Sequence, residues 1–511
     1  MSTRHRVVIV GGGHNSLTAA AYLTRAGAEV TILERLPSVG GAAISALAFP
    51  GVDARLSRYA YLVSLLPARI AADLGLNVKL ARRRYSSYTP VPGTESGLLI
   101  DNADPAATRA SFASIGAAAD AEGFADFYQR SARFADPLFD TMTDPLPTAD
   151  QVKGLLGADW VGFVERPIGE LIETCVTHDL VRGVIATDAL IGTFTDLDDS
   201  TDGNRCLLYH VIGGGTGDWD VPIGGMGVVS GGLARAAAGA TILTEAEVTG
   251  IDPDGEVRYV RAGQEHRVTA DLVLCGAAPE VLARLLGETP QRRTEGAQVK
   301  VNLLLSRLPR LRQPGVAAEA AFGGTFHINE SMSQLNQAWT TARDGAVPDP
   351  LPAEIYCHTL ADPSILGAEA RGYQTLTLFG LQVPDRLVGL YGNDDLRDRL
   401  RAAALASLDS VLGEPIEPLL VTDGNGEPCI EVKTTRDIEH ALAMPGGNIF
   451  HGPLSWPWAD DEPLDTPARR WGVATEHDTL LLCGAGARRG GGVSGIAGQN
   501  AAMAAIEMLG L

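Results

Sequence analysis

The sequence predicts an α/β fold in which helices cover a parallel sheet. Near its start, residues 7–10 form a short run of β-branched side chains that ends at three glycines, as in a strand buried on both faces of such a sheet. Near its end, residues 479–483 (Thr-Leu-Leu-Leu-Cys) form a second run of this kind, again followed by glycines. The chain has 511 residues, which is too long for one simple core, so two closely packed domains are expected.

The charge balance argues against a nucleic-acid partner. The chain carries 41 basic and 62 acidic residues, which gives a formal charge of -21 at pH 7. Such a surface repels phosphates and anionic lipids unless a local basic patch intervenes. We therefore expect no nucleic acid among the partners.

The six cysteines are scattered along the chain, without a Cys-x-x-Cys pair. This pattern contains neither the ligand spacing of a zinc site nor a redox-active dithiol, so no metal is expected. Cys275 and Cys483 lie in apolar runs and are predicted to be buried.

The chain passes directly from a short polar stretch into Val-Val-Ile-Val, which leaves no room for a signal peptide. A cytoplasmic location is therefore expected. No apolar stretch approaches the roughly 20 residues that a membrane-spanning helix needs. Residues 61–66 are apolar enough to dip into a membrane interface, so a peripheral contact stays open, although a buried helix is the commoner fate of such a run.

Residues 7–34 have the pattern of a complete βαβ unit. The first strand is followed by a glycine turn, an Ala-rich helical stretch over residues 17–27 and a second apolar strand over residues 29–33. Gly11 and Gly13 occupy the first two positions of the dinucleotide fingerprint. Glycine there lets the chain turn tightly and bring backbone amides against a pyrophosphate.

Ser16 takes the third fingerprint position, where a small residue still permits close packing of helix and strand. Glu34 ends the second strand about 20 residues beyond the turn, where a carboxylate can accept hydrogen bonds from both ribose hydroxyls of a dinucleotide. A free 2′-hydroxyl is therefore expected. After Arg35, residues 40–43 (Gly-Gly-Ala-Ala) would let the chain pass close to the far side of such a cofactor, with a plain loop as the alternative.

The run at residues 479–483 cannot begin a second βαβ unit, because too few residues follow Gly495 for another strand. This strand is expected to join the first sheet. An Ala-rich helix is predicted to begin near Val493. Its N-terminal amides would favour a negatively charged group in front of them, such as a reduced flavin, while a glycine turn that merely allows close packing is the alternative.

Glycine-rich and apolar segments along the whole chain carry a resemblance to a known family. They are residues 10–16 (VGGGHNS), 34–35 (ER), 40–43 (GGAA), 222–227 (PIGGMG), 245–248 (EAEV), 271–277 (DLVLCGA), 444–452 (MPGGNIFHG), 482–486 (LCGAG) and 490–495 (GGGVSG). In this order they resemble the phytoene-desaturase-like branch of the FAD-dependent amine oxidase superfamily. Few chance matches would keep that order.

This resemblance implies an α/β fold with a Rossmann-like FAD-binding domain of the glutathione-reductase type, assembled from discontinuous segments. The implied segments are residues 1–85, 215–300 and 452–511. An α+β substrate-binding domain, residues 86–214 and 301–451, is inserted between them.

The implied cofactor is non-covalently bound FAD. By resemblance, backbone groups of Val248 would meet the adenine, and Gly276 would follow a strand end near the pyrophosphate. Together with the motifs above, the residues expected at the cofactor are Gly11, Gly13, His14, Asn15, Ser16, Glu34, Arg35, Gly40, Gly41, Ala42, Val248, Gly276, Gly484, Gly486, Gly492 and Val493.

The residues before the C-terminal glycine run depart from the family pattern. Members of the branch often carry proline there, whereas this chain has Arg488 and Arg489. Two cations near the flavin or the mouth of its pocket would anchor a carboxylate or stabilise flavin charge. The alternative is a solvated pair at the tip of a loop.

The resemblance implies an oxidoreductase. Because only one complete dinucleotide fingerprint is present, electrons are expected to come from the substrate rather than from NADPH, and to leave to oxygen or a quinone. Amine oxidases of the wider superfamily generally have arginine where this chain has Ala42. This difference favours a desaturase or dehydrogenase that forms C=C bonds in a small apolar, polyene-like or lipid-like substrate.

Two alternatives remain open. A flavin amine oxidase would need an aromatic pair beside the flavin; Trp456 and Trp458 are the candidates near the glycine run, although we expect them to pack a domain junction. The other alternative is a flavin-binding protein without net redox chemistry, either an isomerase or a structural partner in an assembly.

The sequence identifies no catalytic residue. His210 and His451 lie beside resembling segments and are pocket candidates, as is Arg488, but a lone histidine is more often a structural group than a base. Residues 213–217 (GGGTG) are expected to be a linker between domains, with a mobile lid as the alternative. The sequence gives no oligomeric state.

Overall fold

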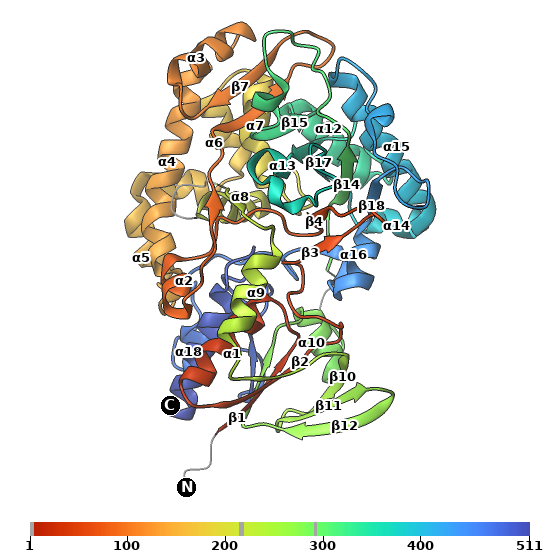
Figure 1. Ribbon diagram of the computed structural model, residues 1–511. Coiled ribbons are helices and arrows are strands. Elements are labelled where there is room, and N and C mark those ends of the chain that lie inside the picture. Colours follow the sequence, from red (N-terminus) through yellow and green to blue (C-terminus); the bar gives the residue numbers. More distant parts are fainter. Residues whose placement is uncertain (1–4, 214–218, 291–293) are drawn as a thin grey trace.

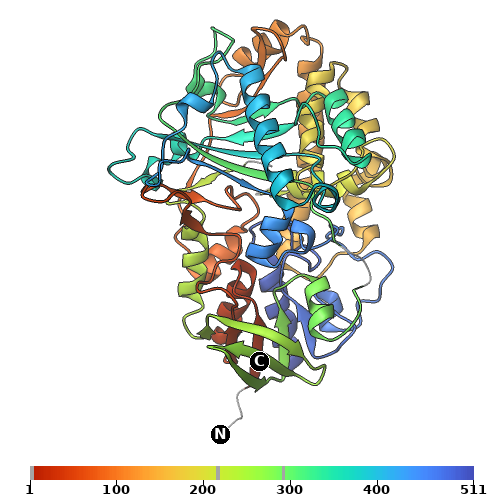
Figure 2. The same cartoon turned by 90° about the vertical axis from the view of Figure 1, so that its right-hand side faces the viewer.

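The computed structural model describes residues 5–213, 219–290 and 294–511. Figures 1 and 2 show two lobes, a lower lobe built on a parallel sheet and an upper lobe built on a larger mixed sheet. The predicted α/β fold is confirmed. The glycine-rich stretch expected to be a linker or lid lies, after Gly213, outside the described residues.

The lower lobe contains a five-stranded sheet in which all neighbouring strands are parallel. The predicted N-terminal strand is central and is buried along its apolar run, as β-branched residues covered on both faces should be. The C-terminal strand joins the same sheet, as predicted. In order across the sheet, the strands are β19 (Leu480–Leu482), β13 (Leu272–Cys275), β1 (Arg6–Val10), β2 (Glu29–Leu33) and β9 (Thr241–Leu243).

One face of this sheet is covered by helices that pack closely together. Gly11 ends β1 with φ +89°, a left-handed conformation that favours glycine, and α1 (His14–Arg25) follows. A Cβ on Gly498 would lie 1.9 Å from the Asn15 carbonyl oxygen, so only glycine allows α18 to approach α1 this closely. The helices on this face include α1, α9 (Gly227–Ala236) and α18 (Ile496–Leu509).

The start of α18 differs from the sequence prediction. The helix begins at Ile496, not near Val493, because Gly495 has φ +76° and cannot belong to a right-handed helix. The amide of Ile496 lies 3.1 Å from the Ser494 hydroxyl oxygen, to which it donates. The segment at Val493 is therefore irregular backbone that precedes the helix.

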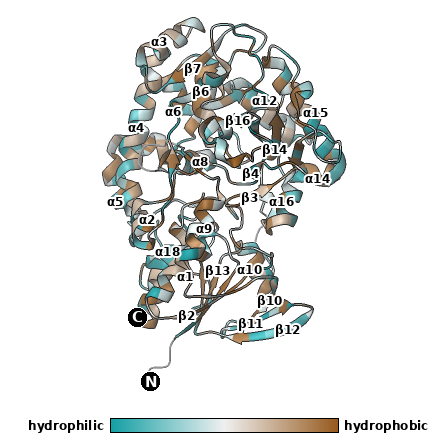
Figure 3. Cartoon of the chain, viewed as in Figure 1, coloured by the Kyte–Doolittle hydropathy of each residue, from teal (hydrophilic) through white to brown (hydrophobic). Residues whose placement is uncertain are grey.

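A three-stranded antiparallel sheet and α10 (Pro279–Leu285) lie on the opposite face of the parallel sheet. Val8 and Val10 pack there with Ala246, Ile251 and Val257 in one buried apolar cluster. Figure 3 shows the strands of the parallel sheet mainly brown and the outer β12 largely teal, so the polar side of this small sheet faces away from the core. Its strands are β10 (Ala246–Ile251), β11 (Glu256–Arg261) and β12 (Gln264–Thr269).

The upper lobe contains a seven-stranded sheet that is antiparallel except where β15 meets β6. It encloses a second apolar core that includes Val301, Leu303, Ile355 and Leu378. In order across the sheet, the strands are β18 (Ile430–Lys433), β14 (Val299–Leu305), β17 (Gln374–Gly380), β16 (Ala353–Tyr356), β15 (Thr325–Ile328), β6 (Tyr85–Pro90) and β7 (Gly97–Asp101).

Further helices and short strands complete the chain. The helices are α2 (Ala68–Leu74), α3 (Pro105–Ser114), α4 (Asp120–Asp140), α5 (Ala149–Leu156), α6 (Ile168–Cys175), α7 (Asp179–Ala186), the 3₁₀ turn η4 (Thr187–Ala189), α8 (Asp202–Val211), α11 (Ala318–Ala321), α12 (Met332–Arg343), α13 (His358–Ala361), α14 (Arg386–Tyr391), α15 (Asn393–Val411), α16 (Thr435–Leu442) and α17 (Pro467–Arg470). The short strands are β3 (Ser45–Leu47), β4 (Arg55–Ser57), β5 (Leu80–Ala81) and β8 (Val221–Pro222).

Residues 61–66, for which a buried helix was the favoured alternative, form no helix. They are irregular, and Val63 exchanges backbone hydrogen bonds with Asp220. Tyr61, Leu62 and Leu65 of this segment line a cavity. Cys275 and Cys483 are buried, as predicted, and among the described residues no helix is both long and apolar enough to cross a membrane.

Candidate functional site

A cavity of about 380 Å³ is lined by residues of both lobes. Its volume is within the range of pockets that bind small molecules. At one end lie the carboxyl ends of β1, β2 and β13, represented by Val10, Leu33 and Gly276. Parallel sheets bind ligands at this edge, next to the loops that follow the strands. At the other end the lining comes from the upper sheet, including Lys300 and Tyr356.

The glycine turn after β1 leaves open space toward this cavity. A Cβ added to Gly13 would meet no atom within 4 Å, whereas one on Gly276 would lie 2.1 Å from the Ser16 hydroxyl oxygen. Gly13 also precedes α1, and no side chain among the described residues caps that helix. Its first amides are therefore available to an anionic group, as the fingerprint predicts.

Glu34 lies at the end of β2 with its carboxylate held in place by the backbone. Oε2 accepts a hydrogen bond from the Gly12 amide at 2.6 Å, and Oε1 accepts one from the Leu36 amide at 2.7 Å. Each carboxylate oxygen has a further lone pair that a ribose hydroxyl can use. Arg35 donates to the Ala441 carbonyl at 3.1 Å, which links the end of β2 to α16.

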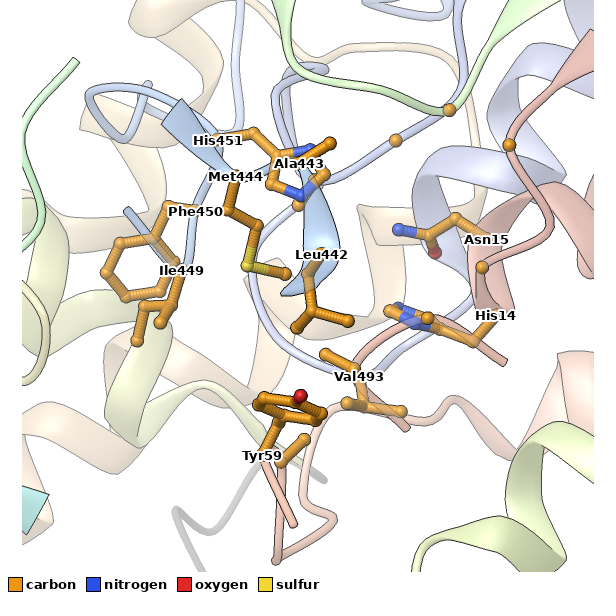
Figure 4. Close-up of a pocket in the computed structure, with 18 of the residues that line it drawn as sticks. His14, Asn15, Tyr59, Leu442, Ala443, Met444, Ile449, Phe450, His451 and Val493 are labelled. Carbon is orange, nitrogen blue, oxygen red and sulfur yellow. The ribbon is translucent and has the colours of Figure 1, made fainter. Parts of the chain in front are cut away.

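His14 and Asn15 line the cavity beside the glycine turn, and His14 also reaches the C-terminal glycine run (Figure 4). Burial lowers the pKa of His14 to about 4, so its ring is neutral, and Nε2 lies 3.2 Å from the Gly492 carbonyl oxygen. Asn15 is buried, and its Oδ1 has no hydrogen-bond partner among the described residues. A buried, unpaired acceptor at a cavity wall is satisfied when a ligand donor binds there.

Most residues predicted at the cofactor line this one cavity, and two do not. Gly40 lies behind the turn and donates from its amide to the Gly12 carbonyl at 2.8 Å. Gly486 packs against Pro279, which a Cβ would approach to 2.4 Å. The predicted residues in the lining are Gly11, Gly13, His14, Asn15, Ser16, Glu34, Arg35, Gly41, Ala42, Val248, Gly276, Gly484, Gly492 and Val493.

Arg488 and Arg489 lie outside the cavity lining, so both sequence interpretations of this pair were wrong. Arg489 is fully buried and its Nη1 donates to the carbonyls of Thr141, Met142 and Asp144 at 2.7 to 3.0 Å. Arg488 pairs with Glu462. Backbone acceptors and a carboxylate draw both guanidinium groups away from the cavity.

Trp456 and Trp458 also lie outside the cavity lining. Their rings stack with centroids 4.7 Å apart, and Trp458 is fully buried and lies 5.6 Å from the Trp160 ring. They are packing residues. The cavity contains a different aromatic pair, Tyr61 and Tyr356, whose ring centroids are 5.0 Å apart.

His210 and His451 both line the cavity. Burial lowers the pKa of each to about 4, so neither is protonated at neutral pH. His210 Nε2 lies 3.1 Å from Asp188 Oδ1, and the His210 ring lies against Trp219 with centroids 4.9 Å apart.

The upper sheet contributes polar residues to the cavity that were not predicted from the sequence. Lys300 is buried in β14, donates to the Tyr59 carbonyl at 3.0 Å and lies 4.4 Å from the centroid of the Tyr61 ring. Desolvation lowers the pKa of Lys300 to about 7. The sequence did contain a sign of this site, because Lys300 is a charged residue inside the otherwise largely apolar run 299–305. Glu354 is likewise a charged residue inside the buried strand β16.

A second cavity, of about 800 Å³, adjoins the first. His327 and Glu354 line it, and Glu330 lies behind them. One ligand atom from each of these three residues lies within 4.8 Å of the others. His327 Nδ1 lies 2.5 Å from Glu330 Oε2, so these two side chains are joined by a short hydrogen bond.

Residues 9–66 match the family model described as NAD(P)-binding Rossmann-like domain. These residues contain the glycine turn, Glu34 and the second glycine pair, so the match indicates a dinucleotide cofactor at this end of the cavity. The fold is that of putrescine oxidase: the two chains superpose with a TM-score of 0.58 at 16% identity, and each is covered over 100% of its length. The chain thus has a Rossmann-like domain at one end of the cavity and the overall fold of putrescine oxidase.

Two relatives extend this likeness over the whole chain. Uncharacterized protein Rv0897c of Mycobacterium tuberculosis is 56% identical, over 98% of this chain and 97% of its own. Pyridine nucleotide-disulfide oxidoreductase domain-containing protein 2 of Rattus norvegicus is 30% identical, over 98% of this chain and 93% of its own. The chain belongs to the family of these proteins.

Proposed function

We propose that this chain is an FAD-dependent oxidoreductase, in which the lower lobe binds FAD and the upper lobe binds the substrate. The observation that carries the proposal is the continuous cavity between the dinucleotide fingerprint and the upper sheet. A cofactor bound by Glu34 and Gly13 would extend along this cavity toward Tyr61 and Lys300. The order of motifs that resembles the phytoene-desaturase-like branch supports the choice of FAD.

The residues present fit FAD in chemistry as well as in position. The open space at Gly13 would receive the pyrophosphate, the carboxylate of Glu34 would accept from the ribose, and the unpaired Oδ1 of Asn15 would accept from a donor of the cofactor. Bound there, FAD would take a hydride from a substrate carbon and later pass its electrons to oxygen or a quinone.

The upper lobe would orient the substrate and keep water out. Tyr61, Tyr356 and Phe379 give this end of the cavity an aromatic wall, and Ile191 and Leu65 add apolar surface. Such walls suit an apolar substrate, so the first candidate reaction is C=C bond formation in a polyene-like or lipid-like compound. A cytoplasmic protein that contacts a membrane peripherally would have access to such substrates.

A flavin amine oxidase is the second candidate. Tyr61 and Tyr356 supply the aromatic pair that such an enzyme needs, and the carboxyl group of Glu354 lies at the same end of the cavity. A carboxylate stabilises the ammonium form of an amine. The putrescine oxidase fold agrees with this candidate, although a shared fold does not by itself imply a shared substrate.

Anaerobic titration of the flavin-loaded protein tests the function and separates the candidates. Phytoene and oleic acid serve as apolar probes, and putrescine and benzylamine as amine probes, while the oxidised flavin absorbance is followed. Bleaching by an apolar probe supports the desaturase, and bleaching by an amine supports the amine oxidase. Bound flavin that no probe bleaches would contradict the redox proposal and favour a non-redox isomerase or structural partner.

Glu34→Gln is expected to weaken FAD binding by at least about tenfold. An amide has one acceptor oxygen, so it cannot accept from both the Gly12 and Leu36 amides and also serve the ribose. Titration of apoprotein with FAD, followed by flavin fluorescence, measures the change. The control is Glu29→Gln, at the exposed start of the same strand, and equal affinity in the two variants would contradict the assigned role.

A further inference from the structure

Four residues line both cavities and therefore form the wall between them: His210, Trp219, Glu354 and Tyr356. The second cavity extends from this wall to the surface, where its lining includes the exposed residue Arg109. A group on the shared wall can thus face the substrate on one side and a route to solvent on the other.

Glu354 is the carboxyl group on this wall and is 2% exposed. Its Oε2 accepts a hydrogen bond from the Tyr356 hydroxyl at 2.6 Å, and its Oε1 accepts one from Thr187 at 3.4 Å. Behind the wall, Asp188 accepts from the Tyr128 hydroxyl at 3.0 Å and lies 3.1 Å from His210 Nε2. Asp188 lines only the second cavity, whereas Glu354 lines both.

We propose that Glu354 is a catalytic residue that accepts the proton released by substrate oxidation, and that His210 and Asp188 pass this proton to the second cavity. The inference rests on the proposed function. In the step, a hydride carries two electrons from a substrate carbon to FAD, the oxidant. The adjacent C–H or N–H bond loses its proton, a C=C or C=N bond forms, and the proton forms an O–H bond on Glu354.

The electrostatics of the cluster agree with this role. Burial raises the pKa of Glu354 to about 7 and that of Asp188 to about 7, so both can gain and lose a proton near neutral pH. His210 is neutral and can accept at one ring nitrogen while it donates from the other. The titratable groups that face Glu354 or Asp188 are Tyr61, Tyr128, Cys206, His210, His327, Glu330 and Tyr356. Arg83 acts on His210, His327 and Tyr356.

A proton explains the cluster better than a metal ion does. The short contact between His327 and Glu330 leaves no room for a cation between their facing atoms. Burial also raises the pKa of Glu330 well above its usual range, which favours the neutral acid. Glu330 lies outside the lining of either cavity. The two carboxyl groups that line the second cavity, Glu354 and Asp188, can be neutralised by protons that this cavity supplies.

The first arm of the test needs no substrate. Infrared difference spectra of the flavin-loaded protein, titrated from about pH 5 to about pH 9, report the C=O stretch of protonated carboxyl groups. We expect a component that is lost with a midpoint near pH 7 in the wild type and is missing in Glu354→Gln. Glu265→Gln, an exposed substitution on β12, should keep it. Identical spectra in wild type and Glu354→Gln would overturn the inference, as would one tightly bound divalent ion per chain found by elemental analysis.

The second arm measures the rate of flavin bleaching in a single turnover, with the probe that reduces the flavin. In the wild type the rate should rise as pH increases through about 7, because only the carboxylate accepts a proton. Glu354→Gln should bind flavin normally, bleach it at least about 100-fold more slowly and lose this pH dependence, and Glu354→Asp should restore part of it.

The outcomes separate the inference from the proposed function. If the wild type bleaches and Glu354→Gln bleaches equally fast, the function stands and the inference is overturned. If the pH midpoint disappears in Lys300→Met but persists in Glu354→Gln, Lys300 is the acceptor and the inference is again overturned. If no probe bleaches bound flavin in any protein, the proposed function fails and the inference fails with it.

Discussion

Gly13→Val is expected to abolish stoichiometric flavin binding while the chain still folds. A Cβ at this position would meet no atom within 4 Å, and Gly13 has φ −70°, which valine adopts without strain. The two methyl groups would occupy the space proposed for the pyrophosphate and keep it from the first amides of α1. We expect the affinity for FAD to fall at least about 100-fold, since the charge-assisted contacts at the helix N-terminus are lost together.

Gly389→Val is the matched control for this prediction. Gly389 is also a site where a Cβ would meet no atom within 4 Å, but it is exposed on α14 in the upper lobe. Both variants should show wild-type far-ultraviolet circular dichroism. Wild-type flavin content in Gly13→Val would show that the cofactor does not pass this turn.

Arg489→Leu is expected to lower the free energy of unfolding by about 2 to 4 kcal/mol. The guanidinium group is fully buried and donates to three carbonyls just after α4. Its removal takes one donor from each carbonyl and, among the described residues, only the Thr141 and Met142 carbonyls keep another donor, the Asp144 amide and the Asn500 side chain respectively. Burial lowers the pKa of Arg489 to about 10, which leaves it charged at neutral pH. Leucine does not carry the desolvation penalty of a buried charge, and this gain offsets part of the free energy lost with the hydrogen bonds.

Denaturant unfolding followed by tryptophan fluorescence measures this effect. The control is Arg469→Leu, which removes an exposed arginine paired with Asp465 at 2.9 Å and should cost less than about 1 kcal/mol. Equal unfolding midpoints in the two variants would show that the buried hydrogen bonds of Arg489 do not stabilise the chain.

Local patterns were sufficient to predict the parallel sheet. The β-branched run of β1, the glycines after it and the apolar run of β2 lie within residues 6–33, so their pairing depends on neighbours in the sequence. The C-terminal strand was predicted to join this sheet because too few residues follow it to form a second βαβ unit. It pairs with β13 and not with β1, a choice that depends on the whole sheet.

The residues that sequence reasoning misplaced depend on contacts between distant segments. Arg489 looked free because its acceptors, Thr141 to Asp144, lie almost 350 positions away. A helix was favoured for residues 61–66 because the local sequence is apolar and does not reveal that Val63 pairs with the remote Asp220. Lys300 and Glu354 were predictable only as charges within apolar strands, and that signal does not say which cavity they face. Tertiary contacts decided each of these positions.

An FAD-dependent oxidoreductase must hold FAD, so the identity and stoichiometry of the bound cofactor decide the proposed function. The purified chain, supplemented with FAD and freed of excess, is denatured with acid, and the released chromophore is separated and weighed by mass spectrometry. We expect about one FAD per chain, released without covalent attachment, from a protein whose visible spectrum has the bands of oxidised flavin. A chain that retains no flavin under these conditions, or that binds only NAD or NADP, would show that the protein is not an FAD-dependent oxidoreductase.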